Sequence, residues 1–227
     1  MVVVHHLENS RSQRILWALE ELGVPYEVKR YKRNKKTSLA PESLKKIHPL
    51  GKSPVITDES DTDEGVTVAE SGAIIEYLAG KYGNGKLTVN TNEDQQRDYQ
   101  YWLHFAEGSL MPPLLLKLVF DKVRKSPMPF FAKPVAKSIS AKVMKSFVGP
   151  NITNNLAFIE DYLATHEWFA GDKLTGADIQ MSFPLEACVA SGVANKQYPN
   201  IIAYVKRIHG RPEYQKALTV GGPYDYA

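Results

Sequence analysis

The alternation of apolar and polar positions at the start of the chain predicts a strand, a helix and a second strand. Three valines in "MVVVHHL" form a short apolar run that is typical of a first strand. Between Arg14 and Leu22, apolar residues recur at helical spacing and would share one face: Ile15, Leu16, Ala18, Leu19 and Leu22. Gly23 ends this helix, and "VPYEVKRYKR" then alternates as a strand does. The pattern therefore predicts a β-α-β unit.

A hairpin and a second helix complete this first unit. Residues 34–52 are polar and interrupted by proline, which favours a long loop with at most a short irregular helix. The β-rich runs "SPVIT" and "GVTVAE" are separated by the acidic, turn-prone "DESDTDEG" and are typical of a hairpin. The helical run "SGAIIEYLAGKYG" follows. The order β-α-β-loop-β-β-α predicts a small mixed sheet over residues 1–82.

The rest of the chain shows no strand pattern. Residues 83–93 are rich in Gly and Asn and are predicted to be a linker, and from Asp94 to the end the pattern predicts helices only. Thr175 and Asp178 have the spacing of a capping box, with Leu174 and Ile179 placed as a hydrophobic staple. The predicted fold class is α+β, with a sheet-containing domain over 1–82 and an all-helical domain over 94–227.

Composition excludes several functional classes. A chain of 227 residues that is 43% hydrophobic can bury a sizeable core, and a net charge of +3 is too small to indicate nucleic-acid binding. The single cysteine, Cys188, excludes a disulfide framework and a Cys-rich metal site. His5 and His6 point to opposite faces of the first strand, so we expect no shared metal ion and place both at the surface or at an edge. The first apolar run is too short for a signal peptide, which favours a cytoplasmic location.

A basic stretch over residues 121–147 carries Lys, Ala, Val and Phe and raises the question of a membrane-surface or anionic partner. We favour the simpler interpretation, a solvated helix face beside a proline-broken loop. Peripheral membrane association stays open.

Three local signals indicate a binding site, and the first is Ser10. Ser10 to Gln13 has the form S-x-x-Q ahead of an apolar helix, which is typical of a capping box worth roughly 1 kcal/mol. A hydroxyl at the positive end of a helix can also donate to an anionic sulfur. On local sequence alone, capping is the favoured interpretation.

The second signal is Ser53-Pro54. Proline cannot donate within a sheet, so we place the backbone of Ser53 at an open sheet edge, where an extended peptide could pair. The third signal is Glu70-Ser71, with Ser71 as the predicted N-cap of a helix whose free N–H groups suit a carboxylate and Glu70 as a partner for an ammonium group. Lys52 could hold a second carboxylate. Together these groups suit a ligand with an amino-acid head, an extended middle and a terminal carboxylate, as in glutathione.

The segments "NSRSQR", "HPLGKSP", "AESGAI" and "LTGADI" together resemble those of a cytosolic glutathione transferase along essentially the whole chain. The resemblance implies a thioredoxin-like amino-terminal domain followed by an all-helical domain. Three further features, "YKRNKKT", "SFPL" and the terminal "GGPY", are similar to a theta-like fungal and bacterial branch that uses serine rather than tyrosine.

The resemblance also implies roles for individual residues. Ser10 matches the serine that contacts the glutathione thiolate, with Ser12 and Asn9 as reserves. Ser53, where the family usually has Val, matches the residue whose backbone pairs with the cysteinyl unit, and the following Pro54 is cis in the family. Glu70 and Ser71 match the pair that holds the γ-glutamyl group of glutathione. Lys52 matches a contact to the glycine carboxylate or to the backbone at that end.

The implied reaction is attack of the glutathione thiolate on a hydrophobic electrophilic small molecule, or on a hydroperoxide, with glutathione as co-substrate and no metal or other cofactor. The family further implies a homodimer, which we place at the exposed side of residues 70–78 and the helix around Trp102. Two alternatives remain. The first is a thiol-disulfide reductase, which would need a cysteine near the first helix, whereas Cys188 lies in the helical domain. The second is a non-catalytic glutathione-binding or protein-interaction module of the same fold.

Overall fold

The computed structural model describes residues 1–34, 36–60, 65–89 and 92–227. Its amino-terminal part holds a four-stranded mixed sheet in the order β2-β1-β3-β4. β1 pairs in parallel with β2 and antiparallel with β3, which in turn pairs antiparallel with β4. The strands are β1 (Val2–Leu7), β2 (Tyr26–Tyr31), β3 (Val55–Asp58) and β4 (Val66–Ala69). This confirms the predicted mixed sheet and hairpin, although residues 61–64 of the predicted acidic turn lie outside the described residues.

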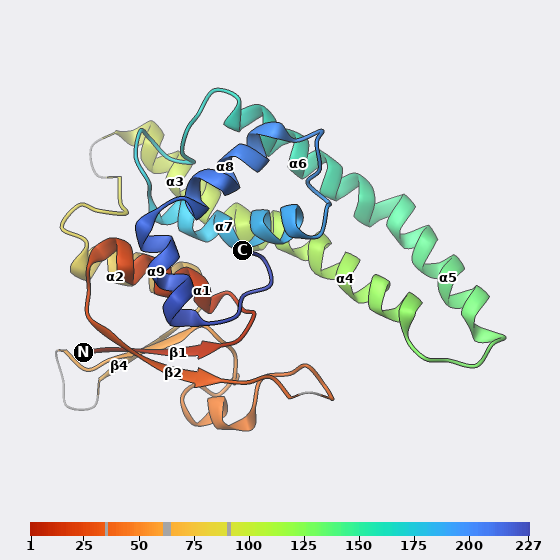
Figure 1. Ribbon diagram of the computed structural model, residues 1–227. Coiled ribbons are helices and arrows are strands. Elements are labelled where there is room, and N and C mark those ends of the chain that lie inside the picture. Colours follow the sequence, from red (N-terminus) through yellow and green to blue (C-terminus); the bar gives the residue numbers. More distant parts are fainter. Residues whose placement is uncertain (35, 61–64, 90–91) are drawn as a thin grey trace.

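Helices α1 (Ser12–Leu22) and α2 (Ser71–Tyr82) cover one face of the sheet (Figure 1). The apolar positions that predicted α1 are buried, and Gly23 ends the helix with φ 70°, a left-handed conformation that glycine adopts without strain. In its described residues, the long loop before β3 contains one 3₁₀ turn, Glu42–Lys46, which agrees with the short irregular helix that the sequence allows.

The placement of His5 and His6 at the surface or an edge is wrong. β1 is an interior strand of the sheet, and His5 and His6 are only 2% and 4% exposed. Their side chains still point to opposite faces: His5 bonds Tyr31 and Thr57, whereas His6 bonds Ser12 on α1. Both rings are therefore part of the interior polar structure.

The second domain is built of helices joined by turns and loops, with no strand among its described residues, and packs above the sheet-covering helices (Figure 1). Its α-helices are α3 (Glu93–Phe105), α4 (Met111–Lys125), α5 (Ala132–Val143), α6 (Gly149–Leu163), α7 (Gly176–Ala190), α8 (Pro199–His209) and α9 (Pro212–Gly221). Two π-helical turns, Ala106–Leu110 and Met144–Val148, join α3 to α4 and α5 to α6. The α+β fold class is confirmed, while the exact division of the chain at 82/83 and 93/94 stays a prediction.

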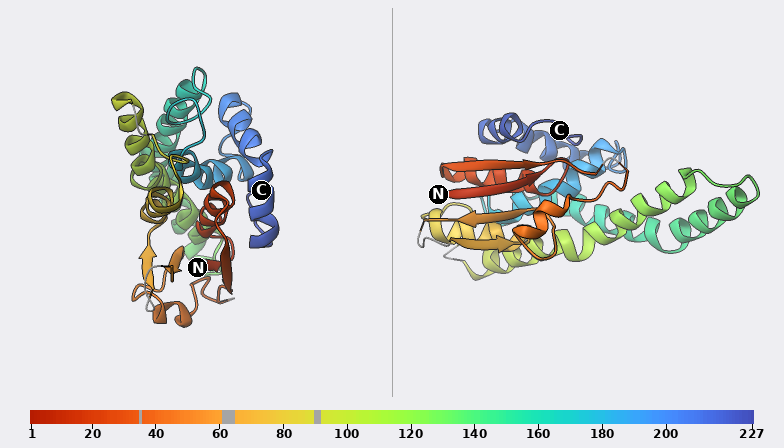
Figure 2. Two further views of the ribbon diagram at one scale, coloured as in Figure 1. Left: turned by 90° about the vertical axis from the view of Figure 1, so that its left-hand side faces the viewer. Right: turned by 90° about the horizontal axis from the view of Figure 1, so that it is seen from below.

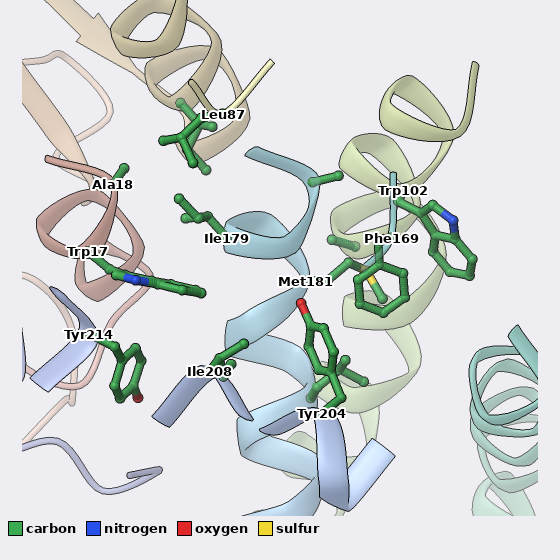
Figure 3. Packing of buried hydrophobic residues seen from close by; sticks show 14 of the residues in the cluster. Trp17, Ala18, Leu87, Trp102, Phe169, Ile179, Met181, Tyr204, Ile208 and Tyr214 are labelled. Carbon is green, nitrogen blue, oxygen red and sulfur yellow. The ribbon is translucent and has the colours of Figure 1, made fainter. Parts of the chain in front are cut away.

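α7 lies at the centre of the hydrophobic core, between α1 and α3 (Figure 3). The predicted capping box at its start is confirmed, because the Thr175 N–H donates to Oδ2 of Asp178 at 2.8 Å and both reciprocal contacts are present. Burial raises the pKa of Asp178 to about 6, although Phe169, Thr175 and Tyr204 donate hydrogen bonds to its carboxylate. A polar cluster thus fixes the start of the central helix.

The hairpin of α4 and α5 extends away from the rest of the molecule (Figures 1 and 2). It contains most of the basic stretch noted in the sequence, and its tip exposes Phe130 and Phe131 to 85% and 69%. Asp121 on α4 is paired with Lys117 and Arg124. Among the described residues, no helix is long and apolar enough to cross a bilayer.

Candidate functional site

The turn after β1 presents Ser10 at the start of α1. Asn9 has φ 48°, and the turn brings Ser10 beneath the first helical turn, where its Oγ accepts a hydrogen bond from the N–H of Ser12 at 3.2 Å. Ser10 remains 6% exposed. The predicted capping box does not form, although Ser10 binds one N–H of the first turn: Arg11 holds the N-cap position without a side-chain capping bond, and the side chain of Gln13 lies buried beside Gly221. The oxygen of the Ser10 hydroxyl is thus bound to an N–H group at the start of α1, and its hydrogen is not used by that bond.

The two reserve residues are engaged elsewhere. Ser12 is fully buried, and its Oγ lies 2.8 Å from Oγ of Ser10 and 2.9 Å from Nδ1 of His6. Asn9 forms a reciprocal pair with Asp225: its side-chain amide donates to Oδ2 of Asp225, and the Asp225 N–H donates to Oδ1 of Asn9, both at 2.9 Å. Of the two serine hydroxyls, that of Ser10 is the less buried and lies at the outer end of the hydrogen-bonded group Ser10–Ser12–His6.

Ser53 lies just before β3, and the Ser53-Pro54 peptide bond is cis. The placement of Ser53 at an open lateral edge is wrong, because β3 is an interior strand between β1 and β4. Ser53 lies instead at the end of the sheet, and its Oγ donates to the carbonyl of His5 at 2.9 Å. Pro54 is buried, whereas Lys52 is exposed. The strand order, which local sequence does not specify, accounts for the difference.

Glu70 and Ser71 mark the start of α2. Ser71 was predicted to be the N-cap, but it is the first helical residue, and Glu70 holds the cap position with φ 72° and no side-chain capping bond. Glu70 is exposed and Ser71 is 3% exposed. The hydroxyl of Ser71 accepts from Nη1 of Arg14 at 3.1 Å. A contact with a distant arginine therefore replaces the local cap.

Arg14 is a site residue that sequence reasoning missed. It is 1% exposed and donates through Nη1 to Oε1 of Glu107 at 2.6 Å, while Arg11 donates through Nε to both carboxylate oxygens at 2.9 and 3.0 Å. Both guanidinium groups lie 5.4 Å from the ring centre of Phe183. The sequence contains one indication of this role: Arg14 is a charged residue directly before the apolar positions of α1.

The charges of this group depend on each other. Burial lowers the pKa of Arg14, and Glu107 acts in the opposite direction. Burial would raise the pKa of Glu107, but the two arginines outweigh it, so the net pKa of this carboxyl is lowered. Among the described residues, neither Nε nor Nη2 of Arg14 has a hydrogen-bond partner. Glu107 comes from a π-helical turn, so the network joins α1, α2 and the helical domain.

These elements place a hydroxyl and two helix amino termini at one end of the sheet, where β1 and β4 end and β3 begins. Free N–H groups of a helix start favour anions, and a hydroxyl can donate to a thiolate. Cys188 belongs to no such arrangement, because it is completely buried and burial raises its pKa to about 12. Within the described ranges, no three His, Cys, Asp or Glu side chains come together as a metal ion would require.

Known proteins resemble this chain over nearly its whole length. Residues 1–80 match the family described as "Glutathione S-transferase, N-terminal domain", and residues 139–212 match "Glutathione S-transferase, C-terminal domain". "Glutathione S-transferase 3" of Schizosaccharomyces pombe is 38% identical over 212 residues, which cover 93% of this chain and 84% of that protein. "Glutathione S-transferase 1" of Saccharomyces cerevisiae is 34% identical over 231 residues, covering 99% and 98%.

The fold agrees with the sequence matches. The crystal structure of a glutathione S-transferase from Actinobacillus pleuropneumoniae has a TM-score of 0.80 and 33% identity to this chain. The similarity covers 100% of this chain and 95% of that one.

Proposed function

The chain belongs to the cytosolic glutathione transferase family and is a glutathione transferase, and we propose that Ser10 activates the glutathione thiol. The observation that carries this proposal is the position of the Ser10 hydroxyl, at the outer end of a buried hydrogen-bonded group and beside the start of α1. Its oxygen accepts from the N–H of Ser12, which holds the hydroxyl in place, and its hydrogen can be donated to sulfur.

The required stabilisation is within reach of these groups. A free cysteine thiol has a pKa of about 8.5, and only its thiolate is an effective nucleophile. Lowering the pKa by about two units takes roughly 2.7 kcal/mol of preferential thiolate stabilisation. A charge-assisted hydrogen bond from Ser10 and the positive end of α1 supply energies of this size. The resulting thiolate attacks an electrophilic carbon of a small molecule.

The remaining residues bind the rest of glutathione. The amino terminus of α2 at Ser71 receives the γ-glutamyl carboxylate, and the exposed Glu70 pairs with its ammonium group. The backbone of Ser53, ahead of the cis-Pro54, pairs with the cysteinyl unit at the end of the sheet, and Lys52 reaches the glycine carboxylate. Arg14 joins this set through its bond to Ser71, which fixes the hydroxyl beside the γ-glutamyl position.

Replacing Ser10 by Ala tests the central assignment. We expect Ser10→Ala to reduce kcat about 10²-fold and to raise the pKa of the bound glutathione thiol. The Kd of glutathione should stay nearly unchanged, because the lost hydrogen bond stabilises the thiolate alone. Ser10→Thr, which keeps a hydroxyl, is the matched control. A pH-rate profile that is the same in Ser10→Ala and the native enzyme would transfer the role to another group.

Several finer properties belong to the same proposal. The acceptor is a hydrophobic electrophile, and hydroperoxides are a second substrate class, since the same thiolate can attack oxygen. The enzyme is cytoplasmic and uses no cofactor besides its co-substrate. Assays with a chloronitrobenzene and with cumene hydroperoxide test the two acceptor classes, and inactivity toward both would favour the non-catalytic module.

The proposed homodimer uses the outer side of α2 and the neighbouring face of α3. The sequence places this contact around Trp102, but Trp102 is only 1% exposed. Its ring centre lies 5.4 Å from that of Phe158 and 4.7 Å from that of Phe169, so its side chain is part of the core. The exposed Tyr101, 46% exposed, is the better contact residue on α3. Light scattering at low concentration should report twice the mass of the 25.4 kDa chain, and a species of single-chain mass would contradict the dimer.

A further inference from the structure

The α4–α5 hairpin carries a charge that the rest of the molecule does not share. Residues 111–148 contain eight Lys or Arg and a single acidic residue, Asp121. Because the whole chain has a net charge of +3, the remaining residues together are net acidic. Six of the eight cations are exposed and form no ion pair with the described residues: Lys122, Lys125, Lys133, Lys137, Lys142 and Lys145. The hairpin therefore presents a concentrated positive charge to its surroundings.

Apolar side chains form two stripes along the same hairpin. Six of them recur at intervals of four residues, three on α4 and three along α5, so each set shares one face of its helix. All six are between 42% and 69% exposed: Leu115, Val119, Val123, Phe131, Val135 and Ile139. Val123 and the α5 set line a shared apolar groove of about 420 Å³, together with Met128 and two alanines. Contiguous exposed apolar side chains of this kind are typical of a contact surface.

The tip of the hairpin combines aromatic rings with lysines. Phe130 and Phe131 are 85% and 69% exposed, and their rings pack edge to face with their centres 5.7 Å apart. The exposed Lys125 and Lys133 flank them in the sequence. A solvated helix face accounts for the lysines, but it does not account for the rings or the apolar stripes. Phenylalanine beside lysine is the composition of a segment that lies at a membrane surface.

A second segment with the same composition lies on the same side of the molecule. Residues 32–52, between β2 and β3, contain seven Lys or Arg and one acidic residue, Glu42. Two leucines of this loop, Leu39 and Leu50, are 66% and 60% exposed. The described part of the loop and the hairpin both lie beyond the ends of β1 and β2, where Ser10 follows the sheet (Figures 1 and 2). Two segments distant in sequence thus present cations and apolar side chains on one side.

We propose that the α4–α5 hairpin docks the enzyme on an anionic lipid bilayer, with the loop over residues 32–52 as a second contact. The rings of Phe130 and Phe131 enter the acyl region, and the lysines remain at the headgroups, whose negative charge complements theirs. A second copy of this chain fits the surface less well, because a two-fold contact would bring two hairpins of equal positive charge together.

Sedimentation of the full chain with lipid vesicles tests the docking. We expect binding to phosphatidylcholine vesicles that contain about 30% phosphatidylserine, and at least about tenfold weaker binding to phosphatidylcholine alone. Raising the salt concentration from about 0.1 M to about 0.5 M should weaken the binding without abolishing it, because the rings still contribute. Equal affinity for the two kinds of vesicle, or binding to neither, would overturn the proposal.

Substitutions separate the apolar contribution from the charged one. Phe130→Ser combined with Phe131→Ser should weaken binding to the anionic vesicles at least about tenfold, while the urea midpoint stays within error of native. Lys133→Gln combined with Lys137→Gln should weaken it at least about fivefold. If the lysine variant binds more weakly but the phenylalanine variant binds as the native chain does, charge attraction alone is responsible and the docking is wrong.

A matched control removes the same charge elsewhere. Lys196 and Lys216 are exposed and lie outside both basic segments, so Lys196→Gln combined with Lys216→Gln should change the affinity less than about twofold. A loss equal to that of the hairpin lysines would show that net charge, and not the hairpin, determines binding.

A site-specific probe locates the contact. The single native cysteine, Cys188, is completely buried, so an introduced cysteine can be labelled selectively. An environment-sensitive dye attached to Phe130→Cys or to Leu39→Cys should shift to the blue with anionic vesicles, whereas a dye on Lys196→Cys should not. No shift at position 130 would overturn the hairpin contact, and no shift at position 39 would overturn the contact of the loop.

The remaining outcomes concern other occupants and the proposed function. If the mass of the protein rises with concentration through the hairpin, so that the double phenylalanine variant prevents the rise, and vesicles are not bound, the surface belongs to a second copy. None of these measurements involves the thiol of glutathione. Failure of the Ser10 assignment therefore leaves the docking intact, and failure of the docking leaves the Ser10 assignment intact.

Discussion

The first turn with α1 and the α4–α5 hairpin distribute polar and apolar groups in opposite ways. Around α1, polar side chains such as His6, Ser12 and Arg14 are buried and hydrogen-bonded across several elements. At the hairpin, Phe130 and Phe131 are exposed, and the ion pairs of Asp121 with described residues are to Lys117 and Arg124 of its own helix. Buried polar groups lose much when a partner is removed, whereas exposed side chains lose little. Sensitivity to substitution should therefore differ sharply between the two regions.

Removing Arg14 should have the largest effect. Arg14→Leu leaves Glu107 and Ser71 without their buried donor, and we expect the free energy of unfolding to fall by about 3 kcal/mol. This value is at the lower end for a broken buried pair, because Glu107 is 34% exposed. Urea denaturation measures the loss. The hairpin supplies the control: Arg124→Leu removes a 50%-exposed arginine that also pairs with an acid, and should change stability by less than about 0.5 kcal/mol. Equal losses would remove the distinction between the regions.

Acidification should destabilise the first region next most strongly. The pKa of His6 is lowered from its ordinary value of 6.5 to about 4 in the folded chain, so the unfolded chain binds a proton more readily between these values. This contribution to stability is fully present above pH 6.5 and is lost as the pH falls toward 4, by about 3 kcal/mol. Unfolding measured across this range should show a shallower slope in His6→Phe. An unchanged slope would mean that His6 already titrates normally in the folded state.

A smaller effect is expected at the contact between the first turn and the end of the chain. Asn9→Ala removes both bonds to Asp225, of which each contributes about 1 kcal/mol or less because the pair is exposed. We expect a stability loss of about 1 kcal/mol and increased hydrogen exchange at Asp225. Asn92→Ala removes an exposed helix cap of comparable size and is a control that should leave exchange at Asp225 unchanged.

The hairpin tip should show the smallest effect. Replacing Phe130 and Phe131 by Ser should change the free energy of unfolding by less than about 0.5 kcal/mol, since both rings are already exposed in the folded chain. A urea midpoint within error of native would agree with this, and a concentration-dependent loss of stability would instead show that another protein copy covers the tip.

Sequence patterns predicted the parts of this structure that depend on neighbouring residues. Helix periodicity located α1 and α2, and the spacing of Thr175 and Asp178 predicted a capping box whose two contacts are present. These signals work because their partners lie within a few residues of one another. The same locality explains the success with the β3–β4 hairpin.

Most of the errors concern partners that are distant in sequence; the exception is the capping box expected of Ser10 and Gln13, which lie only three positions apart. Ser71 does not cap α2, because its hydroxyl contacts Arg14, and Ser53 does not lie at a lateral edge, because β3 is placed between two strands. The Arg14–Glu107 pair joins residues 93 positions apart, which no local pattern reveals. The roles of Ser10 and of the glutathione-binding residues stay predictions.

The pairing of Asn9 with Asp225 has a consequence for how the protein is made. The two residues are 216 positions apart, so at roughly 5 to 20 residues per second a ribosome needs about 10 to 40 seconds to extend the chain from one to the other. During that interval the sheet and α1 can form on the nascent chain while the turn beside Ser10 still lacks its last contact. The turn therefore takes its final shape late, after the domain that carries it.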